Sequence, residues 1–181
     1  MSIKLGLVGK NGAGKSAVCN YLLEHDFTCF SLSNIVRDEA HKKGLPLTRD
    51  NLVSTANILK EEKGAAFLAI QSNEKATGNK IVFDSIRNVD EVDYLRNKNV
   101  ILIGIDAPIE LRYQRIQQRA HGTDHVDFET FKTQDERENS GISSGQNINA
   151  ALEHCTYHLE NIGDLTALQH QVQEILNQCQ D

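Results

Sequence analysis

Short runs of apolar residues recur along the chain, and the segments between them carry apolar residues three or four positions apart. The runs cover residues 3–8, 27–32, 80–84 and 100–105, with a further one at 156–160. Apolar runs of this length are typical of strands buried on both faces of a parallel sheet. The pattern therefore predicts five strands.

Helical spacing fills most of the remaining chain. Residues 16–25 form the first predicted helix, and residues 33–79 hold two or three more, broken at Gly44-Leu45-Pro46 and at Gly64. Further helices are predicted from Pro108 to about residue 120, up to Asn139, around 148–154 and from 165 to 178. Strands that alternate with helices indicate βαβ crossovers, and hence an α/β protein with one parallel sheet.

The composition fits a single domain over residues 1–181. The chain is 39% hydrophobic and 24% charged. A chain of this length buries roughly 70% of its unfolded surface, so the core needs neither disulfides nor a structural metal. The cysteines at positions 19, 29, 155 and 179 lie far apart in sequence and form no CxxC pair, which favours a reducing cytoplasm and a packing role. No run approaches the roughly 20 apolar residues of a membrane span, and the first run is too short for a signal peptide, so a cytoplasmic protein is expected.

Charge is spread unevenly along the chain. Residues 1–137 contain all 19 Lys and Arg together with 19 of the 25 Asp and Glu, so the net charge of -6 lies entirely in residues 138–181. Proteins that bind nucleic acid usually carry an excess of basic residues. The acidic balance therefore argues against a nucleic-acid partner.

One motif follows directly on the first predicted strand. Gly9-Lys10-Asn11-Gly12-Ala13-Gly14-Lys15-Ser16 matches G-x-x-x-x-G-K-[ST] in full. Its glycines let backbone N–H groups turn toward an anion, and the helix that begins near Lys15 points its positive dipole end at the same place. Lys15 supplies a charge for the β and γ phosphates, and Ser16 supplies a hydroxyl ligand for Mg²⁺. The motif predicts a phosphate-binding loop for ATP.

A carboxylate ends the third predicted strand. Asp84 follows Ile81-Val82-Phe83, at the edge of the sheet where α/β proteins bind ligands. It can hold a water of the Mg²⁺ shell, or it can cap the following helix. Guanine-specific GTPases use an N-K-x-D motif, and Asn97-Lys98-Asn99-Val100 lacks the acid, which disfavours a GTPase.

Together these segments resemble the P-loop nucleoside-monophosphate kinases, with their adenylate-kinase-like and dephospho-CoA-kinase-like branches. The resemblance covers almost the whole chain, and its motifs are residues 9–16, Ser33-Asn34-Ile35-Val36-Arg37, Phe83-Asp84-Ser85-Ile86-Arg87 and the series Arg112, Arg115 and Arg119. It implies a three-layer P-loop NTPase fold whose five-stranded parallel sheet has the order 2-3-1-4-5. It also implies a core (1–32, 79–120, 140–181), a helical acceptor-binding region (33–78) and a short lid (121–139).

The resemblance assigns roles to single residues. Arg37 matches the arginine that grips the acceptor phosphate in T-G-D-L-L-R of adenylate kinases. Arg87 ends a segment one residue shorter than their D-G-F-P-R, without its proline and closer to D-G-I-R of small nucleotide-kinase-like proteins. Ser33 joins both arginines on the acceptor side. The remaining expectations place ATP at Gly9, Asn11, Gly12, Ala13, Gly14, Lys15, Ser16, Ala17, Arg115, Asn161 and Gly163, Mg²⁺ at Ser16 and Asp84, and catalysis at Lys15, Asp84, Arg115 and Arg119.

The arginine series also has a physical interpretation of its own. Spacings of three and four place Arg112, Arg115 and Arg119 on one face of the helix after Pro108. Three cations on one stripe repel one another unless an anion is bound, and phosphoryl transfer needs such charges. The alternative is a solvated face paired with Asp106 or Glu110, and for Arg112 the two interpretations stay open.

Two histidine pairs mimic the spacing of a metal site. His121 and His125 lie four residues apart, as do His154 and His158, but neither pair has a third ligand nearby in the sequence. The predicted lid carries no cysteine that could bind zinc. Mg²⁺ is the one metal expected.

The acceptor divides the remaining alternatives. A nucleoside monophosphate attacks through an oxygen that is already anionic, whereas a hydroxyl acceptor such as dephospho-CoA makes use of a base. Ser31-Leu32-Ser33-Asn34 lacks both acids of the D-A-D element of dephospho-CoA kinases, which favours the monophosphate. A kinase of this kind would act as a monomer or homodimer on a small phosphate acceptor. A nucleotide-binding sensor or ATPase without an acceptor is the other alternative.

Overall fold

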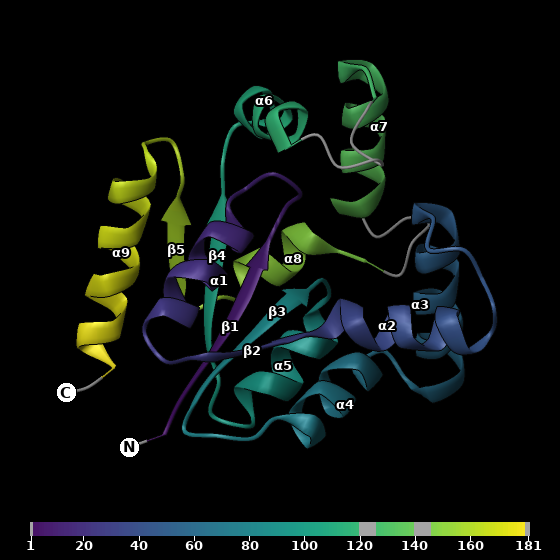
Figure 1. Ribbon diagram of the computed structural model, residues 1–181, viewed down its shortest axis with the longest axis horizontal. Helices are drawn as coiled ribbons and strands as arrows, with labels where there is room; N and C mark the ends of the chain where they lie inside the picture. The colour runs from purple at the N-terminus through teal and green to yellow at the C-terminus, as the bar shows by residue number, and fades with distance from the viewer. Residues whose placement is uncertain (1, 120–125, 140–145, 180–181) are drawn as a thin grey trace.

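The computed structural model describes residues 2–119, 126–139 and 146–179 of the chain. Its sheet is built from strands β1 (Ile3–Gly9), β2 (Thr28–Ser31), β3 (Lys80–Ile86), β4 (Ile101–Asp106) and β5 (Tyr157–Glu160). All neighbouring strands are parallel, and their order is β2-β3-β1-β4-β5 (Figure 1). The predicted fold class and the predicted strand order are both confirmed.

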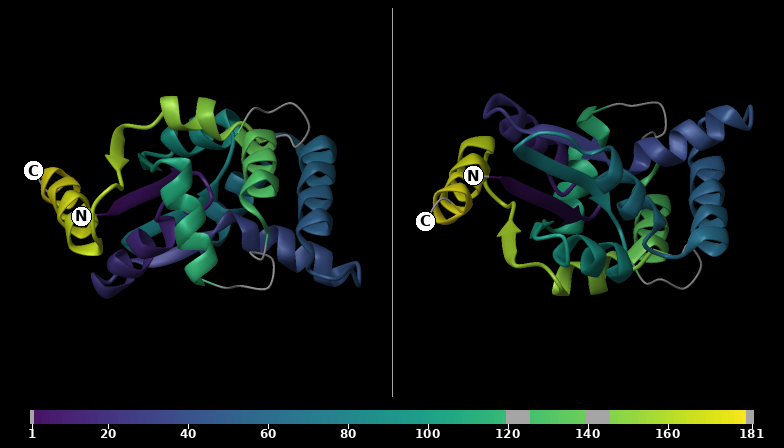
Figure 2. Two further views of the ribbon diagram at one scale, coloured as in Figure 1. Left: turned by 90° about the horizontal axis from the view of Figure 1, so that it is seen from above. Right: turned by 90° about the horizontal axis from the view of Figure 1, so that it is seen from below.

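Helices connect the strands and cover both faces of the sheet. They are α1 (Lys15–Glu24), α2 (Leu32–Lys42), α3 (Arg49–Lys63), α4 (Phe67–Lys75), α5 (Val89–Arg96), α6 (Ile109–Arg119), α7 (Phe128–Asn139), α8 (Ile148–Glu153) and α9 (Leu165–Gln178). Helices α9 and α3 lie at opposite ends of the long axis in both views (Figures 1 and 2). The two ends of the drawn chain lie on the side of α9, away from α3.

Alternation along the central strands creates two hydrophobic cores. Leu5 and Leu7 of β1 and Ile103 of β4 face α1 and α9, where Leu22 and Val172 pack against them. The opposite face carries a second cluster in which β1, β3 and β4 contact α2, α3, α4, α5 and α8; among its members are Val8, Leu102, Phe83, Leu32, Leu59, Leu68, Leu95 and Ala151. The sheet is therefore the middle of three layers, and its carboxyl ends are left free for a site.

The helical region after β2 resolves into three helices. Thr48 caps α3 by accepting a hydrogen bond from the Asn51 amide, and Gly64 ends α3 with a φ of 100°. Asn88 caps α5 by accepting a hydrogen bond from the Glu91 amide. The sequence pattern gave no bounds for this helix. Strand β3 also runs two residues past the predicted 80–84.

Two of the four cysteines lie together in space. The Sγ atoms of Cys19 on α1 and Cys29 on β2 are 2.8 Å apart, with both thiols free. Because β2 returns beside α1, residues ten positions apart in sequence become neighbours. The packing role expected for the cysteines is confirmed for this pair, since Cys19 lies in a hydrophobic core and Cys29 packs against it. No described helix has the length and apolar character that crossing a membrane requires.

Candidate active site

The loop between β1 and α1 has the conformation that the motif requires. Gly12 and Gly14 have φ values of 78° and 116°, which residues with side chains rarely adopt. A Cβ on Gly14 would lie 2.3 Å from Nδ2 of Asn161, and one on Gly12 would lie 2.6 Å from the Arg112 carbonyl oxygen. Both glycines are therefore required by backbone conformation and by close packing.

Lys15 is held across its own loop. Its Nζ donates to the carbonyl oxygens of Gly9, at 2.7 Å, and Lys10, at 2.9 Å. Burial lowers the pKa of Lys15 to about 8, and the nearby Asp84 carboxylate opposes this effect. An anion bound in the loop would favour the charged ammonium, so this lysine is suited to a phosphate ligand.

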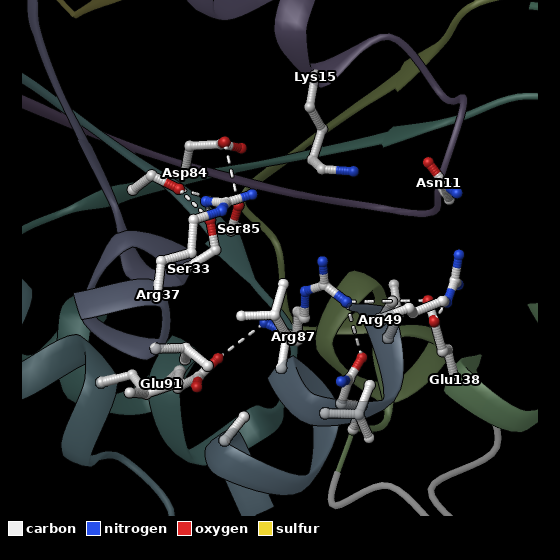
Figure 3. A pocket seen from close by; sticks show the side chains of 18 of the residues that line it. Asn11, Lys15, Ser33, Arg37, Arg49, Asp84, Ser85, Arg87, Glu91 and Glu138 are labelled. Carbon is white, nitrogen blue, oxygen red and sulfur yellow. Dashed lines mark hydrogen bonds and ion pairs between the residues drawn. The ribbon is translucent and has the colours of Figure 1, made fainter. Parts of the chain in front are cut away.

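A cavity of about 500 Å³ opens beside Lys15 and extends to α2 and α3 (Figure 3). Eight of the predicted site residues outside the glycine positions line it, and they come from the loop and the start of α1, from α2, from the end of β3 and from α6: Asn11, Lys15, Ser16, Ser33, Arg37, Asp84, Arg87 and Arg119. Apolar side chains of α2, α3 and α4, among them Val36, Leu52 and Leu68, form another part of its wall. The topology thus brings the predicted donor and acceptor residues to one space.

A chain of hydroxyl groups runs along the cavity from Asp84. Ser85 donates to Oδ2 of Asp84 at 3.1 Å, and its Oγ is 3.1 Å from Oγ of Ser31. The Ser31 hydroxyl in turn lies 2.9 Å from that of Ser33, which accepts a 2.6 Å hydrogen bond from Arg37. The structure therefore links β2, β3 and α2 in one polar network.

Ser85 adopts a strained backbone conformation in this network, with a φ of 66°. Non-glycine residues in this region are uncommon, and such strain is concentrated at functional sites. Ser31 and Ser85 were not selected from the sequence as site residues. A signal for Ser85 was available in the sequence, because Ser85 stands where the D-G-I-R segment has a glycine, a residue that adopts positive φ without strain.

Asp84 keeps one oxygen without a protein partner. Its Oδ1 is buried and makes no hydrogen bond within the described residues, while the Ser16 hydroxyl is exposed to the same cavity. A buried carboxylate oxygen without a partner costs free energy unless a ligand or water satisfies it. A hydrated Mg²⁺, which prefers one or two carboxylates plus phosphate oxygens, fits this pair of groups.

Arg87 meets a carboxylate that sequence reasoning did not select. Its Nη1 donates to Oε1 of Gln146 at 3.0 Å and lies 3.8 Å from Oε2 of Glu138, on α7. The other oxygen of Glu138 accepts a close hydrogen bond from Arg49 of α3. In the sequence Glu138 is one of many charges on a polar helix, so no pattern could have singled it out.

A second ion pair lies deeper in the cavity wall. Nζ of Lys60 is 3.6 Å from Oε1 of Glu91, and both side chains are at least nine-tenths buried. Glu91 also accepts from the Arg87 amide at 2.8 Å. Burial raises the pKa of Glu91, and Lys60 opposes that rise.

Arg112 corrects the predicted stripe of three phosphate-facing arginines. Its side chain is only 3% exposed and forms a two-point ion pair with Asp135, at 2.6 and 2.8 Å, that joins α6 to α7. It also donates to the carbonyl oxygens of Ala107 and Asn11. Arg112 is therefore a buried residue that supports the loop from behind. The solvated face of the second alternative is wrong, but the pairing with Asp106 that it expected is present, at 4.0 Å from Nε of Arg112.

Arg115 and Asn161 support the other side of the loop. Nη2 of Arg115 donates to the Asn161 backbone oxygen at 3.0 Å, and Nδ2 of Asn161 donates to the Ala13 carbonyl at 2.8 Å. A second hollow of about 150 Å³, lined by Gly12, Gly14, Lys15, Ser16, Arg115 and Arg119 among others, lies beside them. Nη1 of Arg115 is buried there without a partner in the described residues.

The turn after β5 is exposed apart from Asn161. Ile162 is 61% exposed, and Gly163 is also exposed and lines neither hollow. The structure therefore gives Asn161 a role beneath the loop that the sequence did not indicate, and the predicted adenine contact stays a prediction.

The histidine pairs show no sign of a metal site in the described part of the chain. No group of three or more His, Cys, Asp or Glu residues there could hold an ion. His154 lies 3.5 Å from Asp93 instead. His121 and His125, with most of the predicted lid segment before α7, lie outside the described residues.

Several solved structures share this arrangement, and kinases are among them. TT1252 from Thermus thermophilus aligns with a TM-score of 0.63 at 18% identity, covering 98% of this chain and 97% of that one. Shikimate kinase from Acinetobacter baumannii, solved with shikimate, aligns with a TM-score of 0.61 at 16% identity, covering 98% and 94%. At these identities the likeness shows the fold, which is that of P-loop kinases.

Sequence comparison places the chain more closely. A family model described as an AAA domain matches residues 5–141, from β1 to beyond α7. The UPF0200 protein MJ1399 of Methanocaldococcus jannaschii is 31% identical over 188 aligned positions, which cover 96% of this chain and 90% of that protein. By these two matches, the chain belongs to the family of AAA domains and to the UPF0200 proteins.

Proposed function

We propose that this protein is an ATP-dependent phosphotransferase that moves the γ-phosphoryl group of ATP to a nucleoside or deoxynucleoside monophosphate. The observation that carries the proposal is the single cavity into which the P-loop, Arg37, Arg87 and Arg119 all open. Phosphoryl transfer depends mainly on positioning and on neutralising the transferring group, and these residues supply both.

The donor nucleotide would lie along the P-loop. Lys15 and the backbone N–H groups of residues 9–17 would hold its phosphates, and Arg115 and Arg119 would approach from α6. The second hollow beside Arg115 supports this placement, because it adjoins the loop opposite the acceptor helices. The turn at Asn161–Gly163, which is exposed apart from Asn161, would contact adenine.

The acceptor would enter between α2 and α3. Arg37 and Arg87 would bind its phosphate, and Ser33 would orient Arg37 through their 2.6 Å hydrogen bond. An oxygen of that phosphate then attacks the γ-phosphorus while the bond to the β–γ bridging oxygen breaks, and ADP leaves. Residues 33–78 would form the acceptor-binding region and residues 121–139 the lid, with the remainder as the core.

Ser16 and Asp84 are the residues that would hold Mg²⁺. The metal would neutralise charge on the β and γ phosphates when bound. Asp84 remains in place for this task because Ser85 fixes one of its oxygens. The other oxygen has no protein partner and so is available to a ligand.

Asp84 also favours a second candidate, transfer to a hydroxyl group as in dephospho-CoA kinases. A buried carboxylate with a free oxygen, beside a chain of serine hydroxyls, could accept the proton that a hydroxyl nucleophile loses. The absence of an acid in Ser31–Asn34 argues for the monophosphate as the first choice.

An acceptor panel tests the proposal. The protein is incubated with Mg²⁺ and ATP together with each ribo- and deoxynucleoside monophosphate in turn, and separately with dephospho-CoA. We expect ADP release that depends on at least one monophosphate and is abolished in Lys15→Ala. Product formed only from dephospho-CoA would establish the second candidate. ATP hydrolysis that is indifferent to every acceptor would overturn both and indicate an ATPase.

A substitution on α2 tests the assignment of the acceptor side. Arg37→Ala removes charge-assisted hydrogen bonds to the acceptor phosphate, so we expect its KM to rise roughly tenfold or more. The KM for ATP should stay within about twofold of wild type. Lys42→Ala, at an exposed position on the same helix, serves as the control. An effect confined to the KM for ATP would show that Arg37 belongs to the donor side.

A further inference from the structure

Three acids of the described residues line the cavity, Asp84, Glu91 and Glu138, and of these Glu138 is the one paired with arginine side chains. It is a buried acid on α7, and its two oxygens face guanidinium groups from separate parts of the chain, Arg49 on α3 and Arg87 after β3 (Figure 3). A carboxylate inside a pocket for an anionic acceptor repels that acceptor. Its presence there needs an explanation that the transfer reaction alone does not give.

The partners of Glu138 form a ready-made site for a phosphate group. Guanidinium groups bind carboxylate and phosphate oxygens in the same forked geometry, so a site that fits one fits the other. The side-chain oxygen of Gln146 accepts a 3.0 Å hydrogen bond from Nη1 of Arg87 and so helps to orient that guanidinium group. The carboxylate of Glu138 therefore occupies the kind of position that a phosphate monoester would take.

Electrostatics place this position within reach of the transfer site. Asp84 has the largest raising effect on the pKa of Lys15, and Glu138 is a further contributor in the same direction. Arg87 and Arg119 oppose them. Glu138 thus lies close enough to the P-loop for its charge to be felt at Lys15.

Asp135, about one turn before Glu138 on α7, helps to hold Glu138 in place. Asp135 fixes the helix to α6 through Arg112, which also contacts the carbonyl oxygen of Asn11 in the P-loop. Residues three apart on a helix share a face, so Asp135 and Glu138 point toward the same side of the protein. The contact between Glu138 and Arg49 thereby ties α7 to α3, and a substrate phosphate can replace it.

We propose that Glu138 holds the place of the acceptor's phosphate group between Arg49 and Arg87 in the free protein, and that the acceptor displaces it. The inference rests on the proposed function and deepens it, since it adds Arg49 to the acceptor site and gives the site a built-in competitor. Before substrate arrives, the carboxylate keeps both arginines oriented and limits their mutual repulsion. Binding of a phosphate monoester then releases α7 from α3.

Removal of the Glu138 charge should raise the affinity for phosphate, although the substitution is made inside the binding site. Glu138→Gln keeps the size of the side chain but removes the competing charge, so the acceptor phosphate should bind about five- to tenfold more tightly. Arg49→Gln should weaken binding by about tenfold. In the double variant Glu138 no longer competes and Arg49 no longer binds, so the gain from Glu138→Gln should be largely lost.

The experiment measures binding without turnover. Inorganic phosphate is titrated calorimetrically into protein saturated with Mg²⁺ and ADP, in wild type and in the three variants. Phosphate bound only at the P-loop would not respond to Arg49→Gln, and its response to Glu138→Gln would be the same with or without Arg49. Glu136→Gln, an exposed acid two positions earlier on α7, is the matched control and should not change the affinity.

Each result has one meaning. Tighter binding in Glu138→Gln together with weaker binding in Arg49→Gln supports the proposal, even if no acceptor in the panel is turned over. Unchanged or weaker binding in Glu138→Gln overturns it, even if monophosphate kinase activity is found. Should Glu138→Gln fail to fold, side-chain ¹⁵N signals of Arg49 and Arg87 in the wild-type protein decide, because added phosphate must shift both.

Discussion

Lys15 illustrates how a single residue combines local sequence with its surroundings. Its place in the P-loop follows from the motif, but its ionisation depends on burial beneath the loop. Burial lowers its pKa to about 8, so the side chain is mostly charged near neutral pH and loses its proton as the pH rises above 8. A bound triphosphate would stabilise the charged form and raise this pKa again.

ATP binding should therefore take up protons in weakly alkaline solution. With a free-protein pKa of about 8, we expect an uptake of about half a proton per ATP at pH 8, and an affinity that falls as the pH rises further. Calorimetry in two buffers of different ionisation enthalpy measures the uptake. Lys15→Arg keeps a charge that does not titrate in this range, so it should lose the uptake. Equal uptake in both proteins would contradict the assignment.

Single residues also mark where sequence reasoning stopped. Arg112, Arg115 and Arg119 share a helical spacing, and that spacing correctly places them on one helix, α6. Which of them faces the cavity depends on α7, which packs against α6. Asp135 of α7 pairs with Arg112 and so holds that side chain away from the cavity. Sequence spacing says nothing about such a partner, because it reports only the residue's own helix.

At the scale of elements, the P-loop is supported by the turn that follows β5. The side chain of Asn161 reaches the Ala13 carbonyl across a sequence separation of 148 residues, and it fills the space where a side chain on Gly14 would lie. The strand order makes this possible, since β4 lies between β1 and β5 and brings the ends of all three to one edge.

Replacement of Gly14 tests this packing. Gly14→Ala should weaken ATP binding by more than about tenfold, because its Cβ would lie 2.3 Å from Asn161 Nδ2 and push the loop away from that support. Gly78→Ala is a matched control, since Gly78 has a similar φ of 112° but no neighbouring atom within 4 Å. Both variants should lose about 1–3 kcal/mol of stability to backbone strain.

The measurement is ATP binding by calorimetry alongside urea unfolding. Only Gly14→Ala should lose affinity, whereas both should lose stability. A Gly14→Ala protein that binds ATP as wild type does would show that the close contact with Asn161 is not required for the loop.

At the scale of the whole molecule, a buried ion pair between Arg112 and Asp135 helps to join the predicted lid helix to the core. The side chains of Arg112 and Asp135 are 3% and 8% exposed. Arg112 also donates hydrogen bonds to the carbonyl oxygens of Asn11 in the P-loop and of Ala107. Removal of one partner leaves the other charge buried and uncompensated. The contact is therefore expected to contribute to the stability of the complete fold.

Asp135→Asn should lower the free energy of unfolding by about 3–5 kcal/mol. Lys75→Gln breaks an ion pair to Asp38 that is more than half exposed on both sides, so its effect should remain within about 1 kcal/mol. Urea unfolding followed by circular dichroism measures both. A loss of less than about 1 kcal/mol in Asp135→Asn would mean that α7 is not integrated into the cooperative core.

The sequence by itself determined the elements and the phosphate-binding loop. Apolar runs identified the central strands β1, β3 and β4, because strands buried in a parallel sheet need continuous hydrophobic side chains. The edge strands β2 and β5 are shorter and largely unburied. The P-loop could be read directly because its conformation is encoded locally, by glycines whose backbone angles other residues avoid. Eight predicted residues beyond the glycines lie in one cavity, since parallel strands bring their carboxyl ends to a common edge.

Only the tertiary structure decided the partners of the charged side chains. Glu138 meets Arg49 across 89 residues, and Arg112 is buried against Asp135 on another helix. Cys19 meets Cys29 because β2 returns alongside α1. An ion pair or a thiol contact depends on where two elements pack in space, and the order of residues along one element contains no information about the other. The proposed acceptor side of this protein was therefore visible in the sequence only as separate arginines, and their contact with the Glu138 carboxylate became visible only in the fold.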